Sequence, residues 1–232
     1  MRALVSSSND DGTQQLYQAA PELIIPALRP YRQRSELTTW TRDESVPGYL
    51  ESRLRQYRYV AIGEFHVHGA QADAPVVRRV LALARQHGLM LHVHADADTL
   101  ERFYLHDPSA RILWAHAGFE GPARVAALLE RHRNLWADLS MRGDIAAEGK
   151  LRPDWHSVLI KHPDRFMVGT DTYTPSRWDQ VGAHARWARG WLADLPQEVA
   201  ERIAWRNGEE VLTAAFIAVS NRQSAESGAQ PR

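Results

Sequence analysis

The feature that most constrains the fold is a regular alternation of short β-favouring runs with longer helical patterns. Seven candidate strands, each bounded by turn-forming residues, lie at 2–7, 23–31, 59–65, 89–95, 111–118, 134–140 and 166–173. Helical patterns separate them, and two more cover 177–195 and 196–216. Strands that alternate with helices pair in parallel through right-handed crossovers. We therefore predict an α/β fold, a (β/α)8 TIM-barrel-like domain in which seven strands are readable.

The chain length and its polar end set the expected domain organisation. A chain of 232 residues is long enough for one large domain with a substantial core. We predict a single domain over residues 1–219. The segment 220–232, SNRQSAESGAQPR, is polar, and we predict that it is a disordered tail.

The composition narrows the class of partner. The chain has 28 Lys and Arg residues together and 28 Asp and Glu residues together, so its charges balance. It lacks the positive charge expected of a protein that binds nucleic acid or an anionic membrane. Cysteine is absent, which leaves only His, Asp and Glu as metal ligands. No apolar run approaches the roughly 18 residues needed to span a bilayer, and no signal-peptide pattern follows Met1. We expect a cytoplasmic protein that acts on a small-molecule substrate.

Ligand-type side chains stand at the ends of several predicted strands. Glu64, His92 or His94, His116 and Asp171 lie at or just before such ends, and Asp138 does so too. In a parallel barrel the carboxyl ends of the strands face the active-site mouth. Burying imidazoles and carboxylates together is costly without a counter-charge, and a divalent metal would stabilise them. Such a metal could lower the pKa of a bound water and polarise a carbonyl.

Two histidine-rich runs, YVAIGEFHVHG (59–69) and GLMLHVHADAD (88–98), leave choices open. His92 and His94 lie on one strand face, and we expect one to be a ligand and the other either to support the ligands from behind or to contact substrate. His92 is favoured because it follows the apolar LML directly. His66 is expected to line a pocket and His68 to lie in a solvated loop. Glu64 could instead form a buried salt bridge with a residue such as Arg29.

The chain contains, in this order, the motifs GEFH, LHVHAD, WAHAGF, ADLS and VGTDTY, followed by Asn207 in RNGEEVL. This set resembles the amidohydrolase superfamily, especially amidohydrolase-related family 2, over about residues 2–219. The resemblance implies a TIM barrel that binds one or two divalent metal ions. We expect Zn²⁺ first, with Mn²⁺ as an alternative. It implies metal ligation by Glu64, by His92 or His94, by His116 and by Asp171. Asp171 would also be the general base.

The family's first strand carries a D-x-H-x-H motif that is not found here. By this resemblance the chain begins with the equivalent of the second strand. Three explanations are open: the sequence starts one β/α unit late, the protein is a degenerate family member, or another chain completes the barrel. We favour the first. A barrel without one strand has two unpaired edges, so we expect this form to pair with a second copy.

The resemblance implies hydrolysis of a C–N, lactone or ester bond by metal-activated water. The alternatives are nonoxidative decarboxylation, phosphoester hydrolysis, which the motif order disfavours, and a degenerate barrel without catalysis. Arg142, shortly after ADLS, and Arg177, after the last strand, are expected to bind a substrate carboxylate, because loops there face the mouth and a guanidinium matches a carboxylate.

Overall fold

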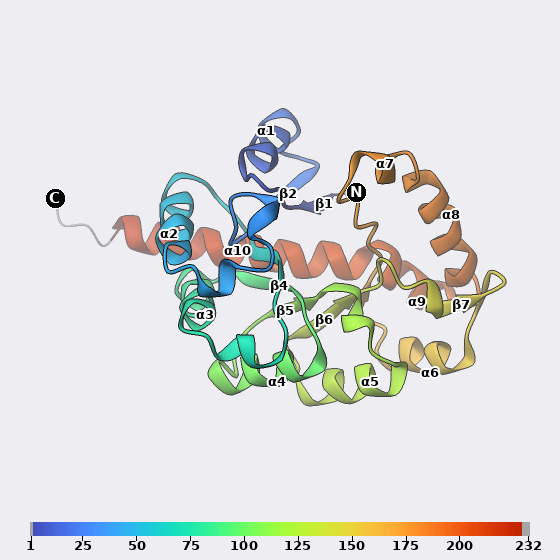
Figure 1. Cartoon of the computed structure of the whole chain (residues 1–232). Helices are drawn as coiled ribbons and strands as arrows, with labels where there is room; N and C mark the ends of the chain where they lie inside the picture. The colour runs from blue at the N-terminus through green and yellow to red at the C-terminus, as the bar shows by residue number, and fades with distance from the viewer. Residues whose placement is uncertain (1, 229–232) are drawn as a thin grey trace. The chain divides into compact units, whose positions relative to one another are not determined.

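The computed structural model describes residues 2–228, which group into two compact units (Figure 1). Unit 1 contains the chain up to Leu113 and again from Glu209, and unit 2 contains Trp114–Gly208. The prediction of one domain over residues 1–219 stays a prediction.

Unit 1 is built on parallel strands in the order β1-β2-β3-β4-β5. Their bounds are β1 Ala3–Val5, β2 Ile24–Leu28, β3 Ala61–His66, β4 Met90–His94 and β5 Ile112–Trp114, whose last residue belongs to unit 2. The register pairs Ala3 with Ile24, Ala27 with Ala61 and Ala61 with Met90. The Leu91 N–H donates to the Arg111 carbonyl at the start of β5, 2.8 Å away. These five strands confirm the first five that the sequence predicts.

Helices connect the strands of unit 1. They are α1 Asp11–Ala19, α2 Val46–Gln56, α3 Pro75–His87 and α4 Ala97–His106, with 3₁₀ turns η1 Arg34–Glu36, η2 Trp40–Arg42 and η3 Gly69–Asp73. Helix α3 packs on β3 and β4. It begins with Pro75 in its first turn and ends at Gly88, whose φ of 68° is the left-handed conformation that favours glycine at a helix end.

The core of unit 1 lies against the faces of β3 and β4. Ile62 and Phe65 of β3 and Val93 of β4 are fully buried. Trp40 of η2 packs edge-on against Phe65, with ring centroids 5.2 Å apart. This packing holds the carboxyl ends of the two strands, where the histidines lie.

Unit 2 contains the remaining two predicted strands, β6 Leu135–Asp138 and β9 Phe166–Met167, paired in parallel with Ala137 opposite Phe166. A short antiparallel hairpin, β7 Ala146–Ala147 with β8 Lys150–Leu151, was not expected from the sequence. The helices are η4 Ala115–Phe119, α5 Pro122–Arg131, η5 Gly143–Ile145, α6 Pro153–Lys161, α7 Pro175–Trp178, α8 Val181–Leu192, α9 Gln197–Glu201 and the π-helical turn η6 Arg202–Arg206. Helix α10, Asn207–Gly228, leads back into unit 1.

Some element bounds expected from the sequence differ from the structure. The strand expected over 166–173 ends at Met167, because the Val168 N–H donates to the Ile203 carbonyl of η6 and leaves the ladder. The helix expected over 177–195 is divided into α7 and α8. The chain is helical from Ser220 to Gly228 and residues 229–232 lie outside the described part, so the disorder expected over 220–232 stays a prediction.

Within the described residues, α10 and the other helices are all too short or too polar to cross a bilayer.

Candidate metal and catalytic residues

The carboxyl half of β3 contains a bulge at Glu64. Gly63 pairs with His92 and Phe65 pairs with Val93, so Glu64 is the extra residue between them. Gly63 has φ 139°, and a Cβ there would lie 2.0 Å from the His92 carbonyl oxygen. Only glycine allows this close approach of the two strands. The bulge therefore depends on Gly63, and it places the buried Glu64 side chain beside the end of β4.

Glu64 lies against His94. The His94 Nδ1 is 3.3 Å from Glu64 Oε1, and the Glu64 backbone N–H donates to Ser6 Oγ over 3.2 Å. The guanidinium of Arg29, the alternative partner considered for Glu64, donates to Ser6 Oγ at 3.1 Å and Ser8 Oγ at 3.4 Å. The contact with His94 favours the ligand interpretation of Glu64 over the salt bridge with Arg29.

The structure separates the two histidines of β4. His94 is opposite His66 in the register, and the two rings stack with centroids 4.1 Å apart. His94 also belongs to a group of His66, His68 and His94 whose potential ligand atoms all lie within 4.8 Å of one another. His92 is opposite Gly63, two residues earlier on β4. The structure thus shows contacts of His94 with His66 and Glu64, and the choice between His92 and His94 as the ligand stays a prediction.

His66 is a neutral imidazole at pH 7. Burial lowers the pKa of His66 to about 4, and the neighbouring His94 acts in the same direction while Glu64 opposes it. A neutral ring keeps a lone pair for a metal or a hydrogen bond. His66 lies at the carboxyl end of β3, and that it lines a pocket stays a prediction.

In unit 2, His116 lies in an unusual left-handed turn directly after β5. His116, Ala117, Gly118 and Phe119 all have positive φ angles, of 56°, 47°, 60° and 55°. Such conformations are costly for residues other than glycine and persist only where their surroundings enforce them. A Cβ on Gly118 would lie 2.2 Å from Cζ2 of Trp114, so the indole packs directly against the turn. The turn fixes the direction of the buried His116 side chain.

Hydrogen bonds fix the tautomer of His116. Its Nδ1 lies 3.0 Å from the carbonyl oxygen of Ser140 and 2.8 Å from Ser140 Oγ. A carbonyl oxygen can only accept, so Nδ1 carries the proton and Nε2 carries the lone pair. The Ser140 hydroxyl and backbone N–H both donate to Asp138 Oδ1. Asp138 is therefore linked to His116 by hydrogen bonds through Ser140. The sequence did not predict a role for Ser140, although it stands two positions after the strand-end carboxylate of Asp138.

Asp171 lies beyond the end of β9 rather than on the strand. Its φ of 45° is left-handed, and its side chain is mostly buried. Asp171 Oδ2 is 4.0 Å from Nε2 of His116. The carboxylate thus stands beside the nitrogen that bears the lone pair, and the two groups can share a cation or a water molecule.

The guanidinium of Arg142 is buried and hydrogen-bonded to the protein. It donates to both carboxylate oxygens of Asp144, at 2.8 and 2.6 Å, and to the carbonyls of His116 and Glu120, at 3.1 and 2.9 Å. It also lies over the ring of Trp155, 4.6 Å from the centroid. These contacts favour a structural role, in which Arg142 holds the left-handed turn. Binding of a substrate carboxylate by Arg142 stays a prediction.

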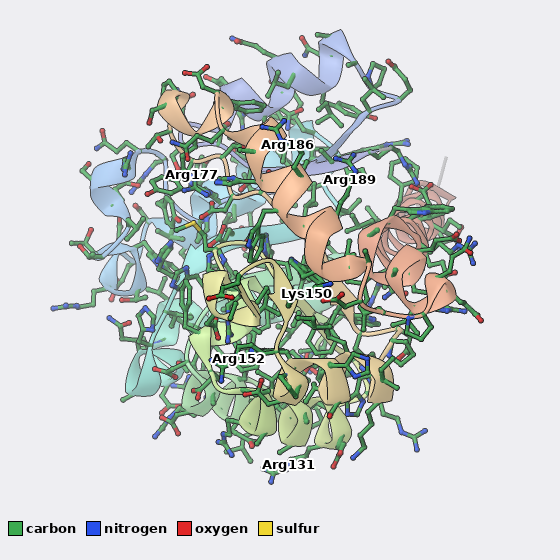
Figure 2. All side chains as sticks on the ribbon, turned by 90° about the vertical axis from the view of Figure 1, so that its right-hand side faces the viewer. Arg131, Lys150, Arg152, Arg177, Arg186 and Arg189 are labelled. Carbon is green, nitrogen blue, oxygen red and sulfur yellow. The ribbon has the colours of Figure 1, made fainter. Side chains whose placement is uncertain are left out.

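Arg177 makes similar contacts in the loop that carries Asp171. It lies in α7, and Figure 2 shows it together with Arg186 and Arg189 of α8. Its Nε donates to the Asp171 carbonyl at 2.7 Å and its Nη2 to the Thr170 carbonyl at 3.2 Å. Arg177 therefore supports the backbone of this loop, and a direct contact with substrate stays a prediction.

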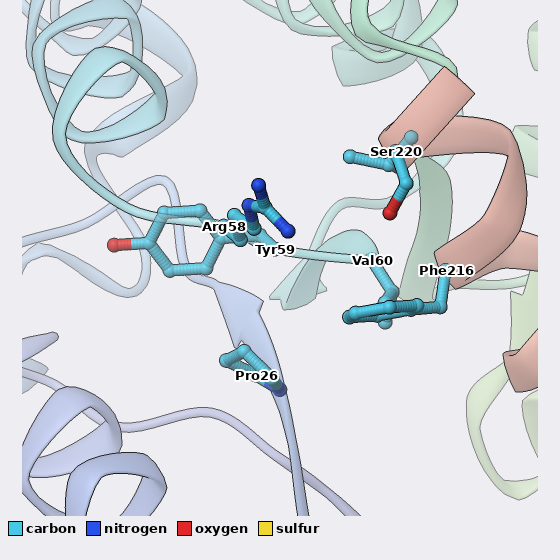
Figure 3. A pocket seen from close by; sticks show the side chains of 7 residues that line it. Pro26, Arg58, Tyr59, Val60, Phe216 and Ser220 are labelled. Atoms are coloured by element: carbon cyan, nitrogen blue, oxygen red, sulfur yellow. The ribbon is translucent and has the colours of Figure 1, made fainter. Parts of the chain in front are cut away.

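A very small, mostly apolar pocket lies elsewhere in unit 1, where β3 begins (Figure 3). It is lined by Pro26, Arg58, Tyr59, Val60, Phe216, Val219 and Ser220. Its lining contains no histidine or carboxylate, and β3 runs from this end towards His66. The pocket is therefore separate from the predicted chemical groups.

The parallel β/α organisation, with histidines and carboxylates after the strands, defines a TIM-barrel-like α/β protein with candidate metal ligands. The chain belongs to the amidohydrolase family, whose family model matches residues 14–213. No curated protein matches the chain.

Solved structures confirm the predicted fold class. An uncharacterized TIM-barrel protein from Bordetella bronchiseptica has 12% identity and a TM-score of 0.65, over 92% of this chain and 78% of that one. A protein of Agrobacterium tumefaciens, solved in apo form, has 18% identity and a TM-score of 0.55, over 91% and 80% of the two chains. An amidohydrolase from Burkholderia multivorans with bound zinc has 17% identity and a TM-score of 0.50, over 88% and 87%.

Proposed function

We propose that the protein is a metal-dependent hydrolase that cleaves a C–N, lactone or ester bond in a small molecule. Membership of the amidohydrolase family supports hydrolysis at the level of the superfamily. The observation that carries the proposal is the pair His116 and Asp171, in which a carboxylate oxygen stands 4.0 Å from Nε2 of an imidazole whose Nδ1 is hydrogen-bonded to Ser140. A mostly buried carboxylate beside a fixed imidazole suits proton transfer and metal ligation.

The residues present fit a divalent metal. Each unit contains a pair of candidate ligands: Glu64 and His94 in unit 1, and His116 and Asp171 in unit 2. Glu64 and His94 already stand at 3.3 Å, and His116 presents Nε2 because its Nδ1 donates to Ser140. Second hydrogen bonds of this kind are typical of metal-binding histidines. Zn²⁺ is the ion we propose first, supported by the zinc in the B. multivorans amidohydrolase, with Mn²⁺ as an alternative.

The chain's own residues divide the remaining tasks. Asp171 accepts a proton from the attacking water and returns it to the leaving group. Asp138 and Ser140 hold the proton of His116 on Nδ1, which keeps the ring in one tautomer throughout. A divalent ion, when bound, supplies Lewis-acid polarisation of the water and of the scissile carbonyl.

Metal removal is expected to abolish hydrolysis. Protein treated with a chelator should lose activity towards a panel of small esters, lactones and amides, and Zn²⁺ or Mn²⁺ should restore it. Elemental analysis measures the metal bound in parallel. Release of carbon dioxide from an unsaturated acid in the same panel would indicate decarboxylation instead. Full activity in metal-free protein would contradict the proposal.

Asp171→Asn is expected to lower turnover by about 10²- to 10⁴-fold, because the amide keeps the shape of the side chain but lacks its basicity. Asp179→Asn, an exposed acid in the same unit, is the matched control and should leave turnover unchanged. Steady-state kinetics on whichever substrate of the panel is hydrolysed, with circular dichroism to verify folding, make the comparison. Near-normal turnover in Asp171→Asn would remove Asp171 from the mechanism.

A further inference from the structure

The motif His66-Val67-His68 is not used by the proposed function, yet its side chains gather beside β4. Val67 is fully buried, and the two histidines flank it. Alternate residues of an extended segment point to the same side, so both imidazoles emerge on the side opposite to Val67. His66 ends β3, and His68 precedes η3. The motif therefore presents two imidazoles next to His94.

The three imidazoles are close enough to share one ion. Potential ligand atoms of His66, His68 and His94 all lie within 4.8 Å of one another. The rings of His66 and His94 are stacked, and that of His68 meets His94 nearly at a right angle, with centroids 5.9 Å apart. Two nitrogens that each lie about 2.1 Å from an ion can be at most roughly 4.2 Å apart. Binding would therefore bring the nitrogens closer together and turn the stacked rings of His66 and His94 until their in-plane lone pairs converge on the ion.

The backbone that carries His66 is held in place. The indole N–H of Trp40 donates to the His66 carbonyl over 2.9 Å, and Trp40 itself is fully buried. The Val67 N–H donates to the His94 carbonyl over 3.1 Å, which ties the motif to the end of β4. Ligands held by such contacts lose little freedom when an ion binds.

The backbone around His68 is fixed as well. The His68 N–H donates to Oε1 of Gln71 at 2.9 Å, and the next N–H, that of Gly69, donates to Oδ2 of Asp96 at 3.1 Å. The same Asp96 carboxylate caps α4 by accepting from the Thr99 N–H, and it lies 3.8 Å from Nδ1 of His68. The negative charge of Asp96 near the His68 ring favours a cation there.

We propose that His66, His68 and His94 form a binding site for a divalent transition-metal cation that prefers imidazole nitrogen, such as Zn²⁺, Cu²⁺, Co²⁺ or Ni²⁺. Mg²⁺ and Ca²⁺ require oxygen ligands and do not fit this donor set. Three histidines leave a fourth coordination position open, as in zinc sites that bind water or substrate. The site shares His94 with the ligands proposed above. The role of the bound ion in catalysis therefore rests on the proposed function, whereas the binding of the ion does not.

Copper titration of the full chain tests the site. The superhyperfine pattern in the electron paramagnetic resonance spectrum of bound Cu²⁺ counts the coordinated nitrogens, and we expect three. His68→Ala should reduce the count to two and weaken binding by at least about 10-fold, since even the loss of an outer partner of a ligand typically costs 10- to 100-fold. The His68 side chain is 54% exposed, so its removal does not threaten the fold. His87→Ala, at the end of α3, is the matched control and should keep three nitrogens. An excess of Mg²⁺ should not displace the copper.

The outcomes separate this site from the proposed function. A spectrum unchanged in His68→Ala, or a nitrogen lost in His116→Ala instead, overturns the three-histidine site, and metal-dependent hydrolysis sensitive to Asp171→Asn would still stand. A three-nitrogen spectrum that is lost in His68→Ala supports the site, even if no metal restores hydrolysis of any substrate. Absence of copper binding in the unaltered chain overturns the site.

Discussion

Arg142→Met is expected to lower the free energy of unfolding by about 3–5 kcal/mol, because it removes a buried guanidinium with four charged hydrogen bonds. Two of these bonds hold the carbonyls of His116 and Glu120, at either end of the left-handed turn. Without them the strained turn loses a main support, and the side chain of His116 should lose its fixed orientation. Urea unfolding followed by circular dichroism measures the change.

Arg152→Met is a closely matched control for Arg142→Met. Arg152 also stands two residues before an aspartate and pairs with Asp154 at 3.1 Å, but its side chain is 51% exposed. An ion pair in solvent contributes little to stability, so this variant should unfold almost as the unaltered chain does. Arg142→Lys should be intermediate, because one ammonium group cannot donate to the carboxylate and both carbonyls in the same geometry. Equal stability of Arg142→Met and Arg152→Met would contradict the structural role of Arg142.

Gly63→Ala is expected to destabilise the protein by several kcal/mol. The φ of 139° is strained for any residue with a side chain, which costs about 1–3 kcal/mol. The new methyl group would lie 2.0 Å from the carbonyl oxygen of His92, and relieving that clash by shifting β4 costs about 1–3 kcal/mol more. The shift would also disturb the contact between Glu64 and His94. Thermal and urea unfolding give the loss of stability.

Gly48→Ala provides the control for this prediction. Gly48 lies in α2, and a Cβ there would have no atom within 4 Å. Alanine in a helix is favoured over glycine by about 0.5–1 kcal/mol, so this variant should be as stable as the unaltered chain or more so. A Gly63→Ala protein that unfolds at the same urea concentration as Gly48→Ala would show that β3 and β4 do not require glycine there.

Much of the fold follows from local patterns in the sequence. All seven expected strands are present, and α3 begins at Pro75 and ends before Gly88 as its pattern predicts. These features depend on the period of apolar residues and on backbone preferences, which act over a few neighbouring positions. The strand predicted over 166–173 is shorter than expected because a carbonyl of the distant η6, that of Ile203, takes the next N–H.

The sequence also marked residues with the right chemistry without fixing what they contact. The sequence predicts that Arg142 and Arg177 bind a substrate carboxylate, because a guanidinium after a barrel strand can do so. In the folded chain their donors meet backbone carbonyls, those of His116 and Asp171 among them. A guanidinium binds a carbonyl and a carboxylate by the same hydrogen bonds, so residue type alone could not distinguish a substrate contact from a support for the loop.

By itself, then, the sequence determined the alternation of strands and helices, the family and the presence of histidines and carboxylates after the strands. Those properties depend on residue type and spacing along the chain. Only the tertiary structure showed that Nδ1 of His94 lies 3.3 Å from Oε1 of Glu64, and that His68 gathers with His66 and His94. Both depend on the bulge at Glu64 and on the register of β3 with β4, because a shift of one residue in a strand turns a side chain to the other face.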